Sequence, residues 1–213
     1  MEAFSSHKGV VLPMMSDNVN TDVIIPSREI KKVSKKGLGE GLFANLRYFP
    51  GSRNPDPDFV LNRPAYARSS ILVARQNFGC GSSREHAVWA LFEYGIRVII
   101  AESFGAIFHD NCVANGLLPC VVPGEAIARI VEWVDEDAQS REITVDLERR
   151  TVTAGPVEVS FNLDEEMRQR LLRGLSPIDV TLKRRADIEK FFAADRTARP
   201  WIHSFGDQGT GEP

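Results

Sequence analysis

Apolar runs of strand length alternate with helix-like segments through the middle of the chain, and this alternation limits the folds that it can adopt. The apolar runs lie at residues 70–74, 97–101 and 117–122. A helical pattern follows each run: the first ends at Gly95, the second ends at Asn115 and Gly116, and the third begins at Pro123 and continues to residue 134. Strands and helices that alternate in this way predict a parallel sheet covered by helices, which is the α/β class.

The pattern changes after residue 139, where apolar and polar residues alternate with a period of two. Residues 143–147 and 157–161 are typical of half-exposed strands and predict a hairpin that turns near Ala154 and Gly155. Asp164 is a suitable N-cap for a helix that ends at Gly174, and residues 187–194 predict a last short helix. We therefore predict a parallel β/α core with an additional antiparallel strand pair and C-terminal helices.

The N-terminal third of the chain is less regular. A predicted strand at residues 10–14 is followed by a polar segment, residues 16–22, and by a short apolar run at residues 23–26. Glycines interrupt residues 27–48, and four prolines mark residues 50–64 as a surface excursion. The length suits one domain over residues 1–205, with an irregular, mobile insertion at residues 27–64 and a disordered, glycine-rich tail at residues 206–213.

Charge and hydropathy argue against several classes of function. The formal net charge is −3, from 26 basic and 29 acidic residues, and the short lysine run at residues 31–36 is best explained as a solvated face. We therefore expect no nucleic-acid partner. No apolar stretch reaches the roughly 20 residues that span a bilayer, and the N-terminus lacks the pattern of a secretory signal. These features predict a cytoplasmic protein with no membrane association.

The spacing of cysteines and histidines argues against a metal centre built by this chain. The three cysteines, Cys80, Cys112 and Cys120, form no CxxC pair, and the four histidines form no HxxxH pattern. A zinc site or a self-contained iron–sulfur cluster is therefore not expected. Structural disulfides are not expected in the cytoplasm either.

The segment between the first apolar run of the core and its helix carries the strongest chemical signal. Residues 79–84 (GCGSSR) place two glycines, two hydroxyls and a guanidinium just before a helix. Glycines permit positive φ angles and close approach of a ligand, and backbone N–H groups at a helix N-terminus attract anions. Arg84 can bind a carboxylate or a phosphate in a bidentate manner. The segment therefore predicts an anion-binding loop, although it departs from the Walker, nucleophile-elbow and dinucleotide patterns.

Some of these residues also have simpler structural explanations. Ser82 can be an N-cap that forms a capping box with Glu85. Cys80 can be a reactive thiol at a helix N-terminus or only a small residue in a tight turn. His86 and Trp89 are better explained as packing residues than as ligands.

Three motifs, in order, resemble the small subunits of 3-isopropylmalate dehydratases, which are equivalent to the C-terminal swivelling domain of aconitases. The first is residues 77–87 (NFGCGSSREHA), and the second is residues 20–26 (NTDVIIP). The third comprises Ser103 and Phe104, Ile107 and Phe108, Asn111 and residues 115–119 (NGLLP). The resemblance extends from about residue 10 to about residue 194. It implies an aconitase-type swivelling domain.

The resemblance implies a hydro-lyase subunit that is inactive without a large partner subunit. The implied reaction removes and re-adds water beside carboxylates, which interconverts 2-isopropylmalate and 3-isopropylmalate in leucine biosynthesis. In this family a [4Fe-4S] cluster on the large subunit binds the substrate hydroxyl and acts as a Lewis acid. The substrate is a small dicarboxylate. No cofactor or metal is expected to bind to this chain itself.

The resemblance also assigns roles to individual residues. Ser82 matches the serine that removes the carbon-bound proton, and helix N-terminal amides together with Arg84 would stabilise its alkoxide. Ser83 and Arg84 match positions that hold the substrate carboxylate. Asp22 matches an acidic residue at the edge of the active site, or it only forms the turn. Thr21 and Arg28 are weaker candidates for substrate binding, and Asn111 and Asn115 are better explained as helix-end and turn residues.

The sequence departs from the family pattern at one place, and this departure leaves the identity of the substrate undecided. Residues 27–30 (SREI) stand where many members of the family carry an aromatic or apolar pair that shapes the pocket for the isopropyl group. The charge of Glu29 keeps related diacids, such as methylated malates or citraconate-type compounds, as alternatives. Two other classes also remain: a non-catalytic anion-binding subunit, and a self-sufficient α/β enzyme with Cys80 or Ser82 as its nucleophile. The sequence does not give the stoichiometry of a complex.

Overall fold

The computed structural model describes residues 1–30, 34–82 and 84–203. Contacts within the chain divide it into two units, residues 1–175 and residues 176–213, each of which is described by itself. The sequence predicts one domain over residues 1–205, and that boundary stays a prediction. The predicted tail at residues 206–213 lies outside the described residues.

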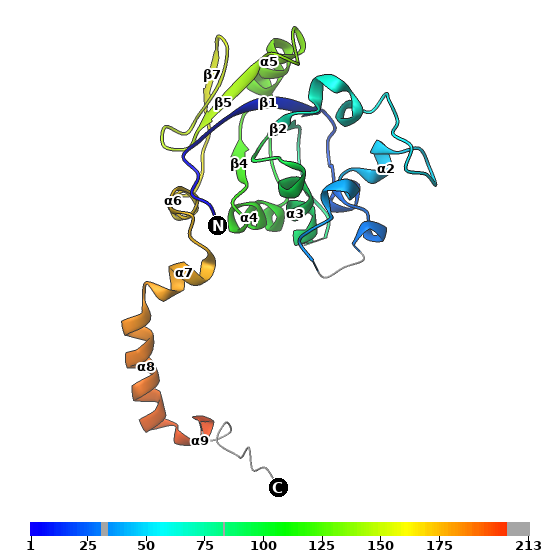
Figure 1. Ribbon diagram of the computed structural model, residues 1–213. Coiled ribbons are helices and arrows are strands. Elements are labelled where there is room, and N and C mark those ends of the chain that lie inside the picture. The colour runs from blue at the N-terminus through cyan, green and yellow to red at the C-terminus, as the bar shows by residue number, and fades with distance from the viewer. Residues whose placement is uncertain (31–33, 83, 204–213) are drawn as a thin grey trace. The chain divides into compact units, whose positions relative to one another are not determined.

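The first unit contains a seven-stranded sheet with the order β4-β3-β2-β1-β5-β6-β7 (Figure 1). Its strands are β1 (Ser6–Met14), β2 (Ser69–Ala74), β3 (Val98–Ala101), β4 (Leu118–Val121), β5 (Glu142–Asp146), β6 (Thr151–Ala154) and β7 (Val157–Ser160). Strands β1 to β4 pair in parallel, whereas β5 to β7 pair antiparallel. Strand β1 joins the two halves, because it is parallel to β2 and antiparallel to β5.

Helices cover both faces of the parallel half, as the alternation of strands and helices predicts. The longer helices of this unit are α3 (Glu85–Tyr94), α4 (Ala106–Ala114), α5 (Gly124–Asp135) and α6 (Glu165–Arg173). Alternate residues of β2 enter different cores: Leu72 packs on the α3 side, and Ile71 packs on the α5 side. Helices α3 and α5 lie on opposite sides of the sheet (Figure 1), so the strands are buried on both faces.

The antiparallel half differs from the predicted pairing. The sequence predicts that residues 143–147 and 157–161 form one hairpin, but β6 lies between β5 and β7 and pairs with both. The predicted turn at Ala154 and Gly155 is confirmed, and it joins β6 to β7. Strand β6 was missed because Arg149, Arg150 and Thr151 hide its short apolar alternation.

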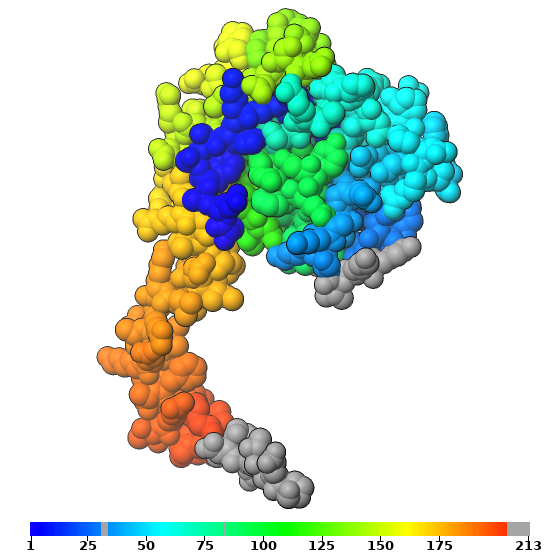
Figure 2. Space-filling model, in the orientation of Figure 1, coloured from blue at the N-terminus to red at the C-terminus, as the bar shows by residue number. Residues whose placement is uncertain are grey.

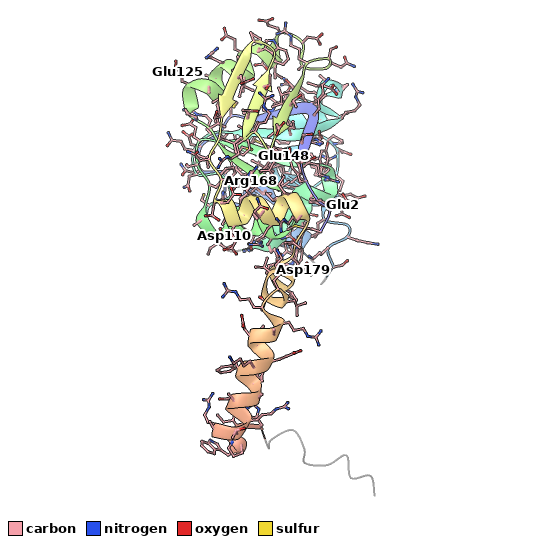
Figure 3. The ribbon with its side chains drawn as sticks, turned by 90° about the vertical axis from the view of Figure 1, so that its left-hand side faces the viewer. Glu2, Asp110, Glu125, Glu148, Arg168 and Asp179 are labelled. Carbon is pink, nitrogen blue, oxygen red and sulfur yellow. The ribbon has the colours of Figure 1, made fainter. Side chains whose placement is uncertain are left out.

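The first residues of the chain lie beside the C-terminal end of α6 and are hydrogen-bonded to it. The backbone N–H of Phe4 donates to the carbonyl of Leu171 at 2.9 Å, and the N-terminal ammonium donates to the carbonyl of Gly174 at 3.2 Å. Figure 2 shows the first residues, in dark blue, beside the gold residues of α6. Figure 3 shows Arg168 of α6 close to Glu148, to whose carbonyl it donates at 3.0 Å. Asp164 caps α6 and Gly174 ends it, as predicted.

The described part of the insertion at residues 27–64 contains short helical segments, and some of its residues belong to the core. It contains η1 (Ser27–Glu29), η2 (Gly39–Gly41), α2 (Ala44–Arg47) and η3 (Val60–Asn62), and η4 (Pro64–Tyr66) begins at its end. Leu42 and Phe43 are fully buried, and Leu61 is 3% exposed. The prediction that residues 50–64 lie wholly outside the core is therefore wrong at Leu61. The mobility of the insertion stays a prediction.

The second unit is helical. It contains α7 (Pro177–Leu182), α8 (Arg185–Ala198) and α9 (Pro200–His203). A capping box between Ser176 and Asp179 starts α7, and α8 extends beyond the predicted residues 187–194 at both ends. Within the described ranges, no helix of either unit has the length and apolar character needed to span a bilayer.

Candidate functional site

Three loops meet at the carboxyl edge of the parallel strands, where α/β proteins commonly bind ligands. The loop after β2 lies between the loops after β1 and β3. On one side, the N–H of Gly79 donates to the carbonyl of Val19 at 2.7 Å, and the N–H of Thr21 donates to the carbonyl of Cys80 at 3.0 Å. On the other side, the N–H of Phe78 donates to the carbonyl of Ser103 at 3.0 Å. The three sequence motifs therefore converge on one place.

Gly79 lets the loop after β2 approach helix α4 closely. Its φ angle is +74°, and a Cβ atom at this position would lie 2.2 Å from the ring of Phe108. That ring meets Phe78 edge to face, with 5.6 Å between the ring centroids. The third motif thus supplies the aromatic base on which the glycine loop rests.

Ser82 lies exposed on the loop, and the buried side chain of Thr21 lies beside it. The Thr21 hydroxyl donates to the Ser82 carbonyl at 3.1 Å, and its Oγ1 lies 3.3 Å from the Ser82 Oγ. Thr21 is 1% exposed, so this contact fixes the loop from below. The structure therefore brings together Ser82, the expected base, and Thr21, a candidate for substrate binding.

Arg84 and Asp22 form an ion pair across the mouth of the site. Ser27 completes the group: its hydroxyl accepts a hydrogen bond from Arg84 Nη1 at 2.9 Å and donates to Asp22 at 3.4 Å. Arg84 remains 31% exposed and Asp22 55% exposed, so solvent reaches both partners. Ser27 was missed by sequence reasoning, because an isolated serine in a loop gives no signal of such a role.

The capping-box explanation of Ser82 is wrong. Helix α3 begins at Glu85, and its N-cap is Arg84, whose side chain makes no capping hydrogen bond. A side-chain cap occurs instead in the second motif, where Asn20 Oδ1 accepts from the N–H of Val23 at 2.9 Å and starts α1 (Thr21–Ile24). Ser83 lies outside the described residues.

Asn115 connects the third motif to α3. It is the C-cap of α4, as its structural explanation predicts. Its amide also donates to Glu85 at 2.7 Å, and its Oδ1 accepts from the indole N–H of Trp89 at 3.0 Å. The ammonium of Lys35 lies 4.7 Å from the Trp89 ring centroid. Asn115 therefore holds the first turn of α3, directly after the glycine loop.

Arg28 is turned toward another part of the surface. Its guanidinium donates to Asn45 at 2.5 Å and pairs with Glu29 at 3.2 Å. Its sequence neighbour Ser27 is bonded to Arg84, so this part of the chain adjoins the site. The structure therefore groups Thr21, Asp22, Ser82 and Arg84, and places Arg28 at their edge.

Ligands for a metal or a cluster are not grouped in the part of the chain that the structure describes, where no three His, Cys, Asp or Glu side chains could hold an ion. All three cysteines are free. Burial raises the pKa of Cys112 and of Cys120 well above the usual range, which makes both thiols poor nucleophiles and ligands. These residues do not fit an iron–sulfur cluster.

Comparison with known proteins gives the family. Residues 1–125 match the model of the aconitase C-terminal domain. The 3-isopropylmalate dehydratase small subunit of Cupriavidus necator is 53% identical over 208 residues, which cover 97% of this chain and 100% of that protein. The chain belongs to the 3-isopropylmalate dehydratase small-subunit family.

Further relatives agree with this family. The small subunit of Marinobacter nauticus is 44% identical over 216 residues, covering 97% of this chain and all of that protein. A crystal structure of 3-isopropylmalate dehydratase from Methanocaldococcus jannaschii aligns with a TM-score of 0.62 and 25% identity, covering 87% of this chain and 98% of that one. The aconitase-type α/β fold predicted from the motifs is therefore confirmed.

Proposed function

We propose that this chain is the small subunit of a two-subunit hydro-lyase that interconverts 2-isopropylmalate and 3-isopropylmalate in leucine biosynthesis. The observation that carries the proposal is the match over 97% of the chain to a small subunit of that enzyme at 53% identity. The three motifs that carry the resemblance also meet at one edge of the sheet. Each motif alone indicates only a loop, whereas hydrogen bonds between the three motifs support the proposal that they form one site.

Ser82 is the proposed base. Its Oγ takes the proton from the substrate carbon, the hydroxyl leaves from the neighbouring carbon, and the two together make the released water. Re-addition of water with exchanged positions gives the isomer. The exposed Oγ of Ser82 lies 3.3 Å from Thr21 Oγ1, and the Thr21 hydroxyl can turn its proton from the Ser82 carbonyl to the alkoxide, which supports this role.

Arg84 is the proposed carboxylate ligand, together with Ser83. The ion pair with Asp22 and the bond to Ser27 hold the guanidinium at the mouth before substrate arrives. A substrate carboxylate meets a pre-oriented donor, which lowers the entropy cost of binding. Asp22 is proposed to line the same mouth, and Arg28 to contact the variable side of the substrate. The buried Thr21 is proposed to assist substrate binding through its hydrogen bond to Ser82.

The larger partner implied by the name of the relatives is proposed to carry the [4Fe-4S] cluster, since the described residues here offer no ligand set for it. The cluster would supply Lewis-acid chemistry at the substrate hydroxyl. The free thiols of the chain agree with the reducing environment of a cytoplasmic enzyme.

One reason to consider other diacids becomes weaker in the structure. Glu29 stands where an apolar residue is common in the family, but its side chain is only 11% exposed and is paired with two arginines. Its charge therefore does not stand free beside the site.

The test is reconstitution. The chain is mixed anaerobically with its cognate large subunit, and the unsaturated intermediate is followed by ultraviolet absorbance. The substrates are isopropylmalate, citrate and methyl-substituted malates. We expect turnover only with both subunits present and a preference for isopropylmalate. Preference for another diacid would keep the mechanism and change the substrate. No turnover with an intact cluster would favour a non-catalytic anion-binding subunit.

A further inference from the structure

A groove of about 650 Å³ lies beside the site, between the segment after α1 and the turn that follows α2. The groove is lined by Arg28, Glu29, Asn45, Tyr48, Phe49 and Arg53, among others. It adjoins the site through the chain, because Arg28 follows Ser27, which accepts a hydrogen bond from Arg84. Arg28, in the wall of the groove, is therefore one residue away from a side chain that contacts Arg84.

Three charged side chains set the electrostatic character of the groove. Arg28 and Arg53 both pair with the carboxylate of Glu29, one through each oxygen. The arginine side chains are 58% and 57% exposed, whereas that of Glu29 is 11% exposed. The negative charge is thus covered and the positive charges face solvent, so the group presents a net positive charge to the groove.

The position of Glu29 depends on two neighbours. A Cβ atom on Gly41 would lie 2.8 Å from the Glu29 Cβ, so the glycine lets the carboxylate stem lie against the backbone of η2. Arg53 covers the carboxylate from the other side, and its guanidinium lies 5.1 Å from the ring centroid of Tyr48. Arg53 comes from the proline-rich turn, which belongs to none of the three sequence motifs.

We propose that Arg53 is a positioning residue for the substrate: it neutralises Glu29 and keeps that carboxylate out of the groove, so that a dicarboxylate meets positive charge only. The inference rests on the proposed function, because the dicarboxylate is the proposed substrate. Without Arg53, Glu29 keeps one partner and its second oxygen faces the groove. The charges of Arg28 and Glu29 then sum to zero, so a doubly charged anion loses the net attraction that the three side chains provided.

The experiment measures KM and kcat for 3-isopropylmalate in the complete two-subunit enzyme. We expect Arg53→Ala to raise KM by about tenfold with a change in kcat below about twofold, because the net attraction for the dicarboxylate is lost and Arg53 does not touch Ser82. Arg53→Lys keeps the charge and should leave KM within about threefold of wild type. The double variant Glu29→Gln with Arg53→Ala should return KM to within about threefold, because the uncovered charge is gone.

The double variant separates this role from a purely structural one. If Arg53 acted only by stacking on Tyr48, removal of the Glu29 charge would not restore KM, and the inference would be overturned. Should Arg53→Ala fail to fold, Glu29→Gln alone gives the reverse test: it leaves both arginines unneutralised and should hold KM at or below the wild-type value. A KM raised by Glu29→Gln would overturn the inference.

Arg63→Ala is the matched control, since Arg63 is an exposed arginine that donates to the carbonyl of Asp58 at 2.8 Å and is not part of the groove. It should leave both constants unchanged. If the wild-type complex did not turn over 3-isopropylmalate, the proposed function itself would be contradicted. Wild-type turnover combined with an unchanged KM in Arg53→Ala would overturn only the role of Arg53.

Discussion

The two halves of the sheet use their loops differently. In the parallel half, β1, β2 and β3 end in loops that are hydrogen-bonded to one another and carry the predicted base and anion ligand. In the antiparallel half, β5, β6 and β7 are joined by short turns, and apolar residues alternate with polar ones. Parallel strands need crossover connections, whose length leaves room for functional side chains at one edge. Hairpins leave little such room, so the proposed catalytic and anion-binding residues all lie on one side of β1.

Ser82 gives the largest expected effect and the sharpest test of this comparison. Ser82→Ala should lower kcat of the two-subunit enzyme by about 10²- to 10⁴-fold, because it removes the group that takes the proton. Complex formation, followed by size-exclusion chromatography, should persist. Ser160→Ala changes an exposed serine of β7 and should leave kcat unchanged. Substantial turnover by Ser82→Ala would show that another residue is the base, and the proposed functional difference between the two halves of the sheet would lose its main support.

A pair of glycines tests the two halves in the same way. Gly79 and Gly155 both have positive φ angles, and a Cβ at either would meet an aromatic ring, 2.2 Å from Phe108 or 2.3 Å from Trp133. Gly79→Ala should lower the free energy of unfolding by about 2–4 kcal/mol, because Phe108 is confined in the core. Gly155→Ala should cost about 1–2 kcal/mol, because the partly buried Trp133 can shift.

Activity then distinguishes the two glycine variants. At a temperature where both remain folded by circular dichroism, Gly79→Ala should lose most of its turnover, whereas Gly155→Ala should retain it. Equal losses of activity would show that the antiparallel half also shapes the site, which the comparison excludes.

Asn115 should give an intermediate effect. Asn115→Ala leaves the indole N–H of Trp89 without its acceptor and frees Glu85, which should cost about 1–3 kcal/mol of unfolding free energy. Urea denaturation followed by fluorescence measures this loss. Asn162→Ala, at an exposed position after β7, is the control and should stay within about 0.5 kcal/mol of wild type. If Asn162→Ala lowered the unfolding free energy as much as Asn115→Ala, the role of Asn115 in connecting α4 to α3 would be contradicted.

Glu93 gives the smallest predicted effect, and it depends on pH. Burial opposes its ionisation, but N–H groups of Gly37, Leu38 and Gly39 donate to its carboxylate and lower its pKa below the ordinary value of 4.5. A depressed pKa in the folded state stabilises the protein above the unfolded-state value, and the contribution is lost as the pH falls through the folded value. The exposed side chain limits it to less than about 1 kcal/mol.

The measurement compares Glu93→Gln with wild type by urea denaturation at pH 7 and at pH 4. We expect a difference in unfolding free energy at pH 7 that narrows at pH 4. A difference that is equal at both pH values would rule out the charge as its source.

Local signals were enough to predict much of the fold and part of the site. The apolar run of β2, the glycine loop and the stop at Gly95 follow from neighbouring residues, as do the cap at Asp164 and the stop at Gly174. The ordered motifs also named Thr21, Asp22, Ser82 and Arg84, which lie together.

What sequence reasoning missed depends on contacts between distant residues. Ser27 and Arg53 form hydrogen bonds to partners 57 and 24 positions away, and no neighbouring residue in the sequence indicates these contacts. In the sequence, Glu93 is an ordinary exposed glutamate of a helix, and its role depends on the hydrogen bond from Gly37, which is 56 positions away. Capping of α3 by Ser82 was predicted from local spacing, but the loop instead bonds to Thr21 and the helix starts at Glu85.

The central place of β1 has a consequence for the order in which the protein forms. Among the seven strands of the sheet, β1 is made first, and its antiparallel partner β5 is made much later, because Ser6 pairs with Asp146. Its parallel partner β2 also follows a long insertion, with Val10 opposite Ser69. Pairings between such distant residues slow folding and leave a strand edge open in the meantime. The edge of β1 that pairs with β5 therefore stays open until residue 146 is made, so a second nascent chain can pair with this edge before β5 covers it.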